Sequence, residues 1–373
     1  MTHAYLDHAA TTPMRPEAVT AMLPLLTETF GNPSGGHAAA RAARHVIEEA
    51  RDVMAAVLGC APAEVIFTSG GTEADNLAIA GVADGAGSAV CSAVEHHAVL
   101  HAVERVEGVV VGTDALGRVD LDQLAAAVGP GTAVVSLMLV NNETGVVQPL
   151  DAAIDVVRAN APDAVLHTDA VAAFSWLDLA VATAGADLVS VSAHKFGGPK
   201  GVGALVVREG VALRGQIVGG GQERDRRSGT HNVAGIAAMA AAAEATVRDR
   251  TATVARIGAL RDLLAERVVS SVPGVVRTAP AAATAAGTCH LRFGGIESEA
   301  LLVLLDDNGV FASAGSSCAS GALEPSHVLR AMGVTPEEAV GALRLSFGWN
   351  STLADVDLAV TAITKAVEQL RAS

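Results

Sequence analysis

The chain has 373 residues, of which 50% are hydrophobic and only 3% aromatic, and its formal net charge at pH 7 is −15. So acidic a protein repels the nucleic-acid backbone, and we do not expect a broad DNA- or RNA-binding face. No apolar run reaches the roughly 18 residues of a membrane span, and the amino terminus lacks the regions of a signal peptide. We therefore expect a cytoplasmic protein with no membrane segment.

Short β-branched runs alternate with alanine-rich stretches through the first part of the chain. We predict strands at residues 65–68, 89–92, 109–112, 134–139, 165–168, 188–192 and 203–207. The predicted helices between them include residues 41–58, 73–83, 121–128 and 150–160. This alternation is typical of an α/β domain with a mostly parallel, seven-stranded sheet. In such sheets, ligands bind at the carboxyl ends of the strands.

The pattern changes after about residue 235. A long helix is predicted at 237–268, and an Ala/Thr/Gly-rich segment at 278–288 is expected to be a surface connection. The remaining predicted elements are strands at 289–293 and 343–346 and helices at 299–307 and 354–372. Since a single core rarely serves so long a chain, we predict a large domain of residues 14–245. A smaller α+β domain would contain residues 1–13 and 246–373.

Two glycines follow the first predicted strand of the sheet, in Thr68-Ser-Gly-Gly-Thr-Glu-Ala-Asp-Asn76. A helix is expected to begin at Thr72 or Glu73. Free N–H groups at a helix start, with glycines that allow close approach, can bind phosphate. The stretch also fits an ordinary turn in which Thr72 caps the helix. It matches neither the Walker loop nor the Gly-x-Gly-x-x-Gly motif.

Two polar residues follow neighbouring predicted strands. Lys195 stands after strand 188–192, before a glycine- and proline-rich bend, where partial desolvation makes an amine a usable nucleophile for an aldehyde. Asp169 ends the preceding strand and could hold a protonated pyridine nitrogen. The alternative for Asp169 is a simple helix cap, which is the commoner role of a lone aspartate at a strand end.

Histidine and cysteine positions give two further candidates. In Glu95-His-His-Ala98, one histidine could lie flat on an aromatic cofactor and shuttle protons. We interpret the pair as part of a strand, whose adjacent residues point to opposite faces, so no shared metal ion is expected. Four cysteines match no zinc template. Three lie among apolar or small residues, whereas Cys318 lies in the polar stretch Ser-Ala-Gly-Ser-Ser-Cys-Ala-Ser-Gly.

In series, these motifs resemble the cysteine desulfurases (NifS/IscS-like) of the class V aminotransferase group, which are fold-type I enzymes that use pyridoxal 5′-phosphate (PLP). The resemblance covers nearly the whole chain in the same order. Its other matching stretches are Tyr5-Leu-Asp-His-Ala-Ala-Thr-Thr-Pro13, Phe30-Gly-Asn-Pro-Ser34, Val140-Asn-Asn-Glu-Thr-Gly145, Arg227-Ser-Gly-Thr230, the segment 313–330 around Cys318, and Leu343-Arg-Leu-Ser-Phe-Gly348.

The resemblance implies roles for the cofactor-binding residues. Lys195 would form the Schiff base with PLP, His96 would stack on its ring and assist proton transfer, and Asp169 would pair with its ring nitrogen. Thr230 would reach the phosphate bound in a neighbouring subunit, which implies a homodimer. Within one subunit, the residues that bind its own PLP phosphate would be Gly71, Thr72, Ser192 and His194.

The resemblance also implies how the substrate is handled. Asn142, beside the cofactor, and Arg344 would hold the carboxylate of L-cysteine, a bidentate task suited to guanidinium. Cys318 would accept the sulfur as a persulfide and pass it to an acceptor protein. The product would be L-alanine.

One position departs from the family pattern in a way that bears on chemistry. The family usually has glutamine where this chain has Ala172, and that amide would hydrogen-bond the phenolic oxygen of PLP. Alanine has no donor, so a water molecule or another residue must replace it, or the reaction differs.

Several functional readings stay open at this point. The desulfurase could supply iron–sulfur clusters, tRNA thiolation, DNA phosphorothioation or a thio-natural product. Another class V enzyme, such as a selenocysteine lyase, a C–S lyase or an epimerase, is the main alternative, and a non-catalytic scaffold for sulfur-transfer partners is the third. The basic cluster at Arg224, Arg226 and Arg227 is either solvated surface or an anion site.

Overall fold

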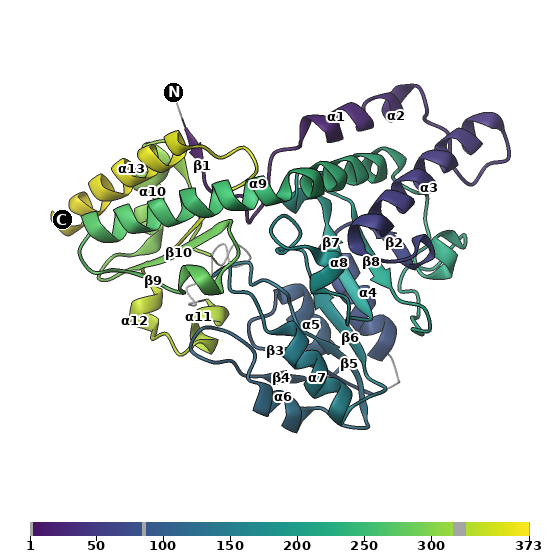
Figure 1. Cartoon of the computed structure of the whole chain (residues 1–373), viewed down its shortest axis with the longest axis horizontal. Coiled ribbons are helices and arrows are strands. Elements are labelled where there is room, and N and C mark those ends of the chain that lie inside the picture. Colours follow the sequence, from purple (N-terminus) through teal and green to yellow (C-terminus); the bar gives the residue numbers. More distant parts are fainter. Residues whose placement is uncertain (1–2, 84–86, 316–325, 373) are drawn as a thin grey trace.

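The computed structural model describes residues 3–83, 87–315 and 326–372, and these form a seven-stranded sheet in the order β2-β8-β7-β6-β5-β3-β4 (Figure 1). In this sheet β8 runs antiparallel to both of its neighbours, and the other pairs are parallel. The predicted α/β class is confirmed. The strands are β2 (Val65–Thr68), β3 (Ser88–Ser92), β4 (Val109–Val111), β5 (Thr132–Ser136), β6 (Val165–Asp169), β7 (Leu188–Ser192) and β8 (Gly203–Val207).

Helices cover both faces of this sheet, which is why its strands are apolar on both sides. In β3, for example, Val90 packs into the cluster that includes α3, whereas Ala89 and Cys91 pack toward α5. The helices of this unit are α1 (Pro16–Met22), α2 (Pro24–Thr27), α3 (Ala38–Leu58), α4 (Gly71–Ala83), α5 (His97–Arg105), α6 (Leu121–Ala127), α7 (Leu150–Asn160) and α8 (Leu179–Ala182).

A second unit has its own hydrophobic core around a three-stranded antiparallel sheet in the order β12-β10-β9. The amino-terminal β1 belongs to it, because β1 pairs with β11. Its strands are β1 (Ala4–Tyr5), β9 (Val275–Arg277), β10 (Thr288–Phe293), β11 (Val310–Phe311) and β12 (Ala342–Ser346), and its helices are α10 (Ser298–Asp307), α11 (His327–Ala331), α12 (Pro336–Ala339) and α13 (Leu353–Ala372).

The 39-residue helix α9 (Val233–Ser271) runs through both units (Figure 1). Its first part, including Ile236 and Met239, packs into the core of the large sheet. Its last part, including Leu264 and Val268, packs into the second core. We propose that the boundary between the large and small domains falls inside this helix, near residue 246. No helix in the described ranges is both long and apolar enough to cross a membrane.

Element boundaries follow the sequence closely where apolar runs have clear ends. The predicted limits of β2, β7, β8 and α7 are confirmed to the residue. Strand β5 ends at Ser136, three residues before the predicted end. The expectation that residues 278–288 form a surface connection is wrong: Ala283 and Ala285 are buried, and Thr284 pairs with Val146. Small side chains there allow the backbone to pack closely against the neighbouring segment.

A buried ion pair fixes the segment that follows β8. The Glu223 carboxylate accepts hydrogen bonds from both terminal nitrogens of Arg51 in α3, each at 2.8 Å. It also accepts one from the backbone N–H of Phe67 at 3.1 Å and one from Nε2 of His231 at 2.7 Å. Glu223 itself has a φ of 46°, in the left-handed region that non-glycine residues rarely adopt. The pair thus holds a strained turn in place.

We expect Glu223→Gln to lower the free energy of unfolding by about 3–5 kcal/mol, because it leaves the Arg51 guanidinium buried without its counter-charge. Burial raises the pKa of Glu223, but hydrogen bonds from Arg51 and His231 outweigh it and lower that pKa to about 2. The folded pKa is thus below the unfolded value of about 4.3. The stabilisation is therefore complete above about pH 4.3 and lost as the pH falls toward 2.

Urea unfolding at fixed protein concentration, at neutral pH and along an acid series, measures this effect. The matched control is Asp357→Asn, which breaks an exposed pair with Arg267 and should cost less than about 1 kcal/mol. Equal losses in the two variants would refute the assignment of Glu223 as a buried anchor.

Candidate active site

A cavity of about 350 Å³ lies where β2, β3, β6 and β7 end. Thr230 lies outside its described lining, on an exposed segment, and Cys318 lies outside the described residues. The predicted site residues that do line the cavity are Gly71, Thr72, His96, Asn142, Asp169, Ser192, His194, Lys195 and Arg344.

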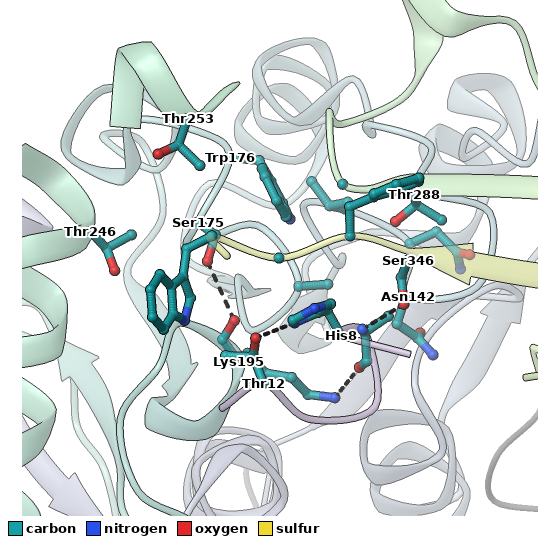
Figure 2. Close-up of a pocket in the computed structure, with 18 of the residues that line it drawn as sticks. His8, Thr12, Asn142, Ser175, Trp176, Lys195, Thr246, Thr253, Thr288 and Ser346 are labelled. Atoms are coloured by element: carbon teal, nitrogen blue, oxygen red, sulfur yellow. Dashed lines mark hydrogen bonds between the residues drawn. The ribbon is translucent and has the colours of Figure 1, made fainter. Parts of the chain in front are cut away.

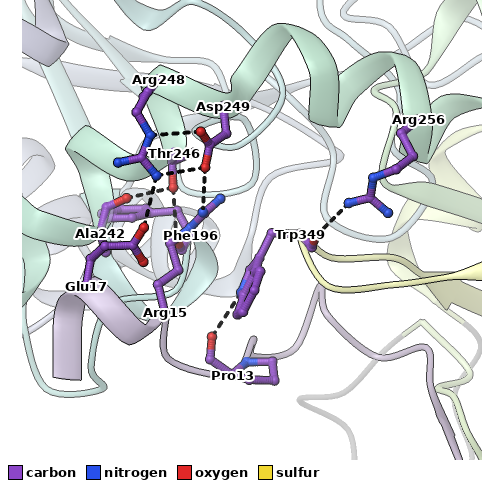
Figure 3. A network of polar contacts seen from close by, with 10 residues as sticks. All are labelled: Pro13, Arg15, Glu17, Phe196, Ala242, Thr246, Arg248, Asp249, Arg256 and Trp349. Carbon is purple, nitrogen blue, oxygen red and sulfur yellow. Dashed lines mark hydrogen bonds and ion pairs between the residues drawn. The ribbon is translucent and has the colours of Figure 1, made fainter. Parts of the chain in front are cut away.

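Lys195 ends the short 3₁₀ turn η2 (Ala193–Lys195) directly after β7. Its Nζ donates to the carbonyl oxygens of Ala9 and Ala10, the latter at 3.0 Å. The next residue is held firmly, since the Phe196 carbonyl accepts from Thr246 Oγ1 at 3.1 Å and from Arg15 Nε at 3.4 Å (Figure 3). The lysine therefore extends from a fixed backbone into the cavity.

Asp169 lies at the end of β6, the strand next to β7, as predicted. One carboxylate oxygen accepts from the N–H of Val171 at 2.8 Å. Burial raises the pKa of Asp169 to about 6, against the effects of that hydrogen bond and of the Lys195 charge. A protonated ring nitrogen would supply the counter-charge that so buried a carboxylate needs.

Two more ionisable residues lie next to Asp169, and neither was predicted from the sequence. His167 faces the same side of β6, and its two ring nitrogens bond Ser136 Oγ at 2.8 Å and Ser190 Oγ at 2.9 Å. Asp75 of α4 lines the cavity, and burial raises its pKa well above the usual range. A sequence signal existed for Asp75, because it stands in the first turns of the helix that follows the glycine pair.

His96 is the N-cap of α5. The interpretation of His96 and His97 as part of a strand was therefore wrong. His96 Nδ1 accepts from the N–H of Ala98 at 3.1 Å, which places the proton of the neutral ring on Nε2. Burial, followed by the Lys195 charge, lowers the pKa of His96 to about 4. The ring is therefore neutral at physiological pH and can exchange protons.

Three other histidines continue outward from His96. The His97 ring lies 4.6 Å from that of His327 and 5.3 Å from that of His101, between ring centroids. His97 and His327 also line the cavity. Within the described ranges, no group of three or more His, Cys, Asp or Glu side chains could hold a metal ion.

The predicted phosphate site has the shape of a tight cradle. A Cβ added at Gly71 would lie 2.8 Å from Cγ2 of Val171, so any larger residue here would force Val171 to shift. Helix α4 begins at Gly71 itself, slightly earlier than predicted. Ser192 is buried at the end of β7, and His194 bonds Thr11 Oγ1 at 3.2 Å. Backbone N–H groups, a hydroxyl and an imidazole therefore converge on one end of the cavity.

Arg344 is 1% exposed and lies in the wall of the cavity. Its guanidinium donates to Asp7 Oδ1 at 2.8 Å and to the carbonyl of Asn142 at 3.0 Å. Asp7 was not predicted, although it stands in the Tyr-Leu-Asp-His stretch already singled out. These contacts orient the guanidinium before any ligand arrives.

The residues on either side of segment 316–325 line the cavity as well: Gly315 precedes it and His327 follows it closely. Ser326 Oγ donates to Glu143 Oε2 at 2.5 Å, and Glu143 is also in the cavity wall. The described residues that flank positions 316–325 therefore lie at the site.

Comparison with known proteins decides the family. The model of the class-V aminotransferase family matches residues 4–359. The chain is 44% identical, over 385 residues, to a Mycobacterium tuberculosis protein named IscS-like cysteine desulfurase, covering 99% of this chain and 97% of that one. It is 41% identical over 376 residues to the cysteine desulfurase IscS of Dictyoglomus turgidum, covering 98% and 95%. The chain belongs to the cysteine desulfurase family.

Solved structures agree with this assignment. A structure named NifS-like protein superposes with a TM-score of 0.92 at 32% identity and covers 99% of this chain and 100% of that one. The predicted fold-type I architecture of the cysteine desulfurases is thereby confirmed.

The cofactor expected for a cysteine desulfurase fits the described side chains. The cavity offers a lysine for the aldehyde, a buried carboxylate for the ring nitrogen, a neutral imidazole beside the ring, and a glycine cradle that a Cβ would fill. Of the basic cluster, Arg227 pairs with Glu73 at 2.8 Å, which ties the segment bearing Thr230 to the start of α4. That arginine is thus neither free surface nor an open anion site.

Proposed function

We propose that this chain is a PLP-dependent cysteine desulfurase that converts L-cysteine to L-alanine and transfers the sulfur first to Cys318 and then to an acceptor protein. The observation that carries the proposal is the convergence of Lys195, Asp169 and Arg344 on one cavity. An amine, a buried carboxylate and a guanidinium together suit an amino acid attached to a pyridine cofactor.

Each residue has a defined task in this proposal. Lys195 would hold the cofactor through its aldehyde, Asp169 would keep the ring nitrogen protonated, and His96 would cover the ring. Arg344, oriented by Asp7, holds the substrate carboxylate together with Asn142. The residues that would bind the phosphate group of PLP are Gly71, Thr72, Ser192 and His194. When bound, PLP withdraws electrons from the substrate and makes its Cβ–S bond labile.

The sulfur-transfer step is a displacement at sulfur. The Cys318 thiolate attacks the substrate sulfur, an S–S bond forms, and the Cβ–S bond breaks with its electron pair going to carbon. That carbon takes up a proton, and alanine leaves. The carbon is reduced as the sulfur becomes a persulfide, so no external oxidant is needed. A second thiol then releases the sulfur.

The proposal includes a homodimer. Thr230 is exposed in the single chain, and so are large apolar side chains that a second copy would cover. Phe30 is 75% exposed and Val218 is 83% exposed. The acceptor protein is proposed by its chemistry only, as one that presents a thiol to the Cys318 persulfide.

Product analysis tests the activity. The protein, loaded with PLP and given L-cysteine and a reducing thiol, should yield alanine and sulfide in equal amounts. Pyruvate and ammonia would instead indicate a C–S lyase, and D-cysteine an epimerase. Turnover of selenocysteine without turnover of cysteine would indicate a selenocysteine lyase. Any of these three outcomes would overturn the proposed reaction.

A further inference from the structure

A second, smaller cavity of about 40 Å³ adjoins the first, and we refer to it as the annex. The two cavities share four lining residues: Ala9, Asn142, Ala172 and Lys195. Ala172 is the position where the family resemblance leads us to expect glutamine. Because alanine ends at Cβ, a longer side chain at this position would take up space in the cavities that Ala172 lines.

Polar groups face the annex without protein partners. The side chains of Asn142, Trp176, Thr253 and Thr288 line it and make no hydrogen bond to any other described side chain or backbone group. Thr288 is only 8% exposed. Figure 2 shows Trp176 and Thr253 on one side of this space and Lys195 and Thr12 on the other. Asn142, Trp176 and Thr253 are half-buried, whereas Thr288 is buried. A buried hydroxyl normally has a hydrogen-bond partner, so Thr288 is the side chain that points to a bound polar ligand.

The walls of the annex are held by close packing and hydrogen bonds. Its side chains therefore cannot move inward to fill the cavity. A Cβ at Gly287 would lie 2.1 Å from the Trp176 ring, which shows how closely the two pack. Trp349, another wall residue, donates from Nε1 to the carbonyl of Pro13 at 3.2 Å (Figure 3). Its own carbonyl accepts from Arg256 at 2.6 Å.

The size of the annex restricts what it can hold. A buried water needs roughly 10–15 Å³ of such volume and two to four polar partners. The annex therefore has room for about three or four water molecules. An amino-acid substrate is too large for it.

The chemistry of PLP determines which of its atoms faces the annex. The aldehyde carbon that joins Lys195 has the phenolic oxygen on one flank and the phosphate-bearing carbon on the other. Gly71 and Ser192, proposed for the phosphate, line the main cavity but not the annex. With the phosphate held as proposed, the phenolic oxygen would lie on the flank of Asn142 and Ala172.

We propose that ordered water in the annex, held by Thr288 and its unpartnered neighbours, donates a hydrogen bond to the phenolic oxygen in place of the glutamine amide that this chain lacks. The inference rests on the proposed function, since it requires bound PLP. It makes the annex a solvent site built into the cofactor pocket, with Thr288 as a positioning residue.

The pH titration of the bound cofactor's visible absorption, without substrate, tests this proposal. The proton that titrates lies between the nitrogen joined to Lys195 and the phenolic oxygen. A donor to that oxygen stabilises the phenolate left when the proton leaves, so the donor lowers the titration midpoint. Ala172→Met and Ala172→Gln add side chains of equal length that displace the water, but only glutamine restores a donor.

We expect the midpoint of Ala172→Met to rise by at least about one pH unit, a tenfold change in the proton equilibrium. Ala172→Gln should titrate close to the unsubstituted protein, and Thr288→Val should shift in the same direction as Ala172→Met by a smaller amount. The proposal would be overturned if the unsubstituted protein had the same midpoint as Ala172→Met. It would also be overturned if the unsubstituted protein, Ala172→Met and Ala172→Gln all had the same midpoint. A protein with no visible absorption would contradict the proposed function itself, which keeps the two failures distinguishable.

Discussion

Replacement of Lys195 by alanine is expected to abolish the visible absorption of the bound cofactor and to lower alanine production by at least about 10³-fold. In the proposed function the lysine amine would join the aldehyde and take part in proton transfer, a role worth roughly 10²–10⁴-fold by itself. Absorption spectra of the purified, PLP-treated variant and an alanine assay measure the two effects.

The matched control is Lys200→Ala, five residues along the chain. Lys200 is exposed and does not line the cavity, so this variant should keep both the absorption band and the activity. A Lys195→Ala protein that retains the band, or a Lys200→Ala protein that loses it, would mean that the wrong lysine has been assigned.

Replacement of Cys318 by serine is expected to reduce sulfide release by at least about 10³-fold, because a hydroxyl is not a nucleophile toward sulfur as a thiolate is. The cofactor band should remain and should still change when L-cysteine is added, since Lys195 and Arg344 are untouched. Stopped-flow spectra and a sulfide assay on the same preparation separate these two outcomes.

The described cysteines supply the control for this variant. Burial raises the pKa of Cys60 to about 11 and that of Cys289 to about 12, and it raises that of Cys91 as well. Thiols with a pKa raised this far do not form the thiolate at neutral pH. Cys60→Ser should therefore keep full activity, whereas full sulfide release by Cys318→Ser would refute its role as the sulfur acceptor.

The sequence predicted the sheet well because its strands are apolar runs with distinct ends. Strands β7 and β8, for example, are separated by a glycine- and proline-rich bend that leaves no doubt about their limits. The prediction for residues 278–288 was wrong because alanine, threonine and glycine there give no periodic pattern. The close packing of this segment depends on the distant residues that it contacts. The prediction at His97 was also wrong, since nothing local marks the start of α5.

The candidate site was predictable to the extent that its residues stand in motifs. Lys195 and Asp169 follow strands and therefore meet at one edge of the sheet. Asp7 and Asp75 were missed because their importance arises from partners distant in the chain, Arg344 and His167. The annex could not be predicted at all, because it exists only where side chains of the two proposed domains enclose a space.

A single turnover with L-cysteine in the absence of a reducing thiol tests the central claim most directly. The cofactor-loaded protein would be mixed with substrate, quenched and digested under non-reducing conditions, and its peptides weighed by mass spectrometry while free alanine is quantified. The account predicts one additional sulfur atom on the peptide that contains Cys318 and one alanine per chain. Alanine formed without sulfur on Cys318, or sulfur released with pyruvate in place of alanine, would contradict it.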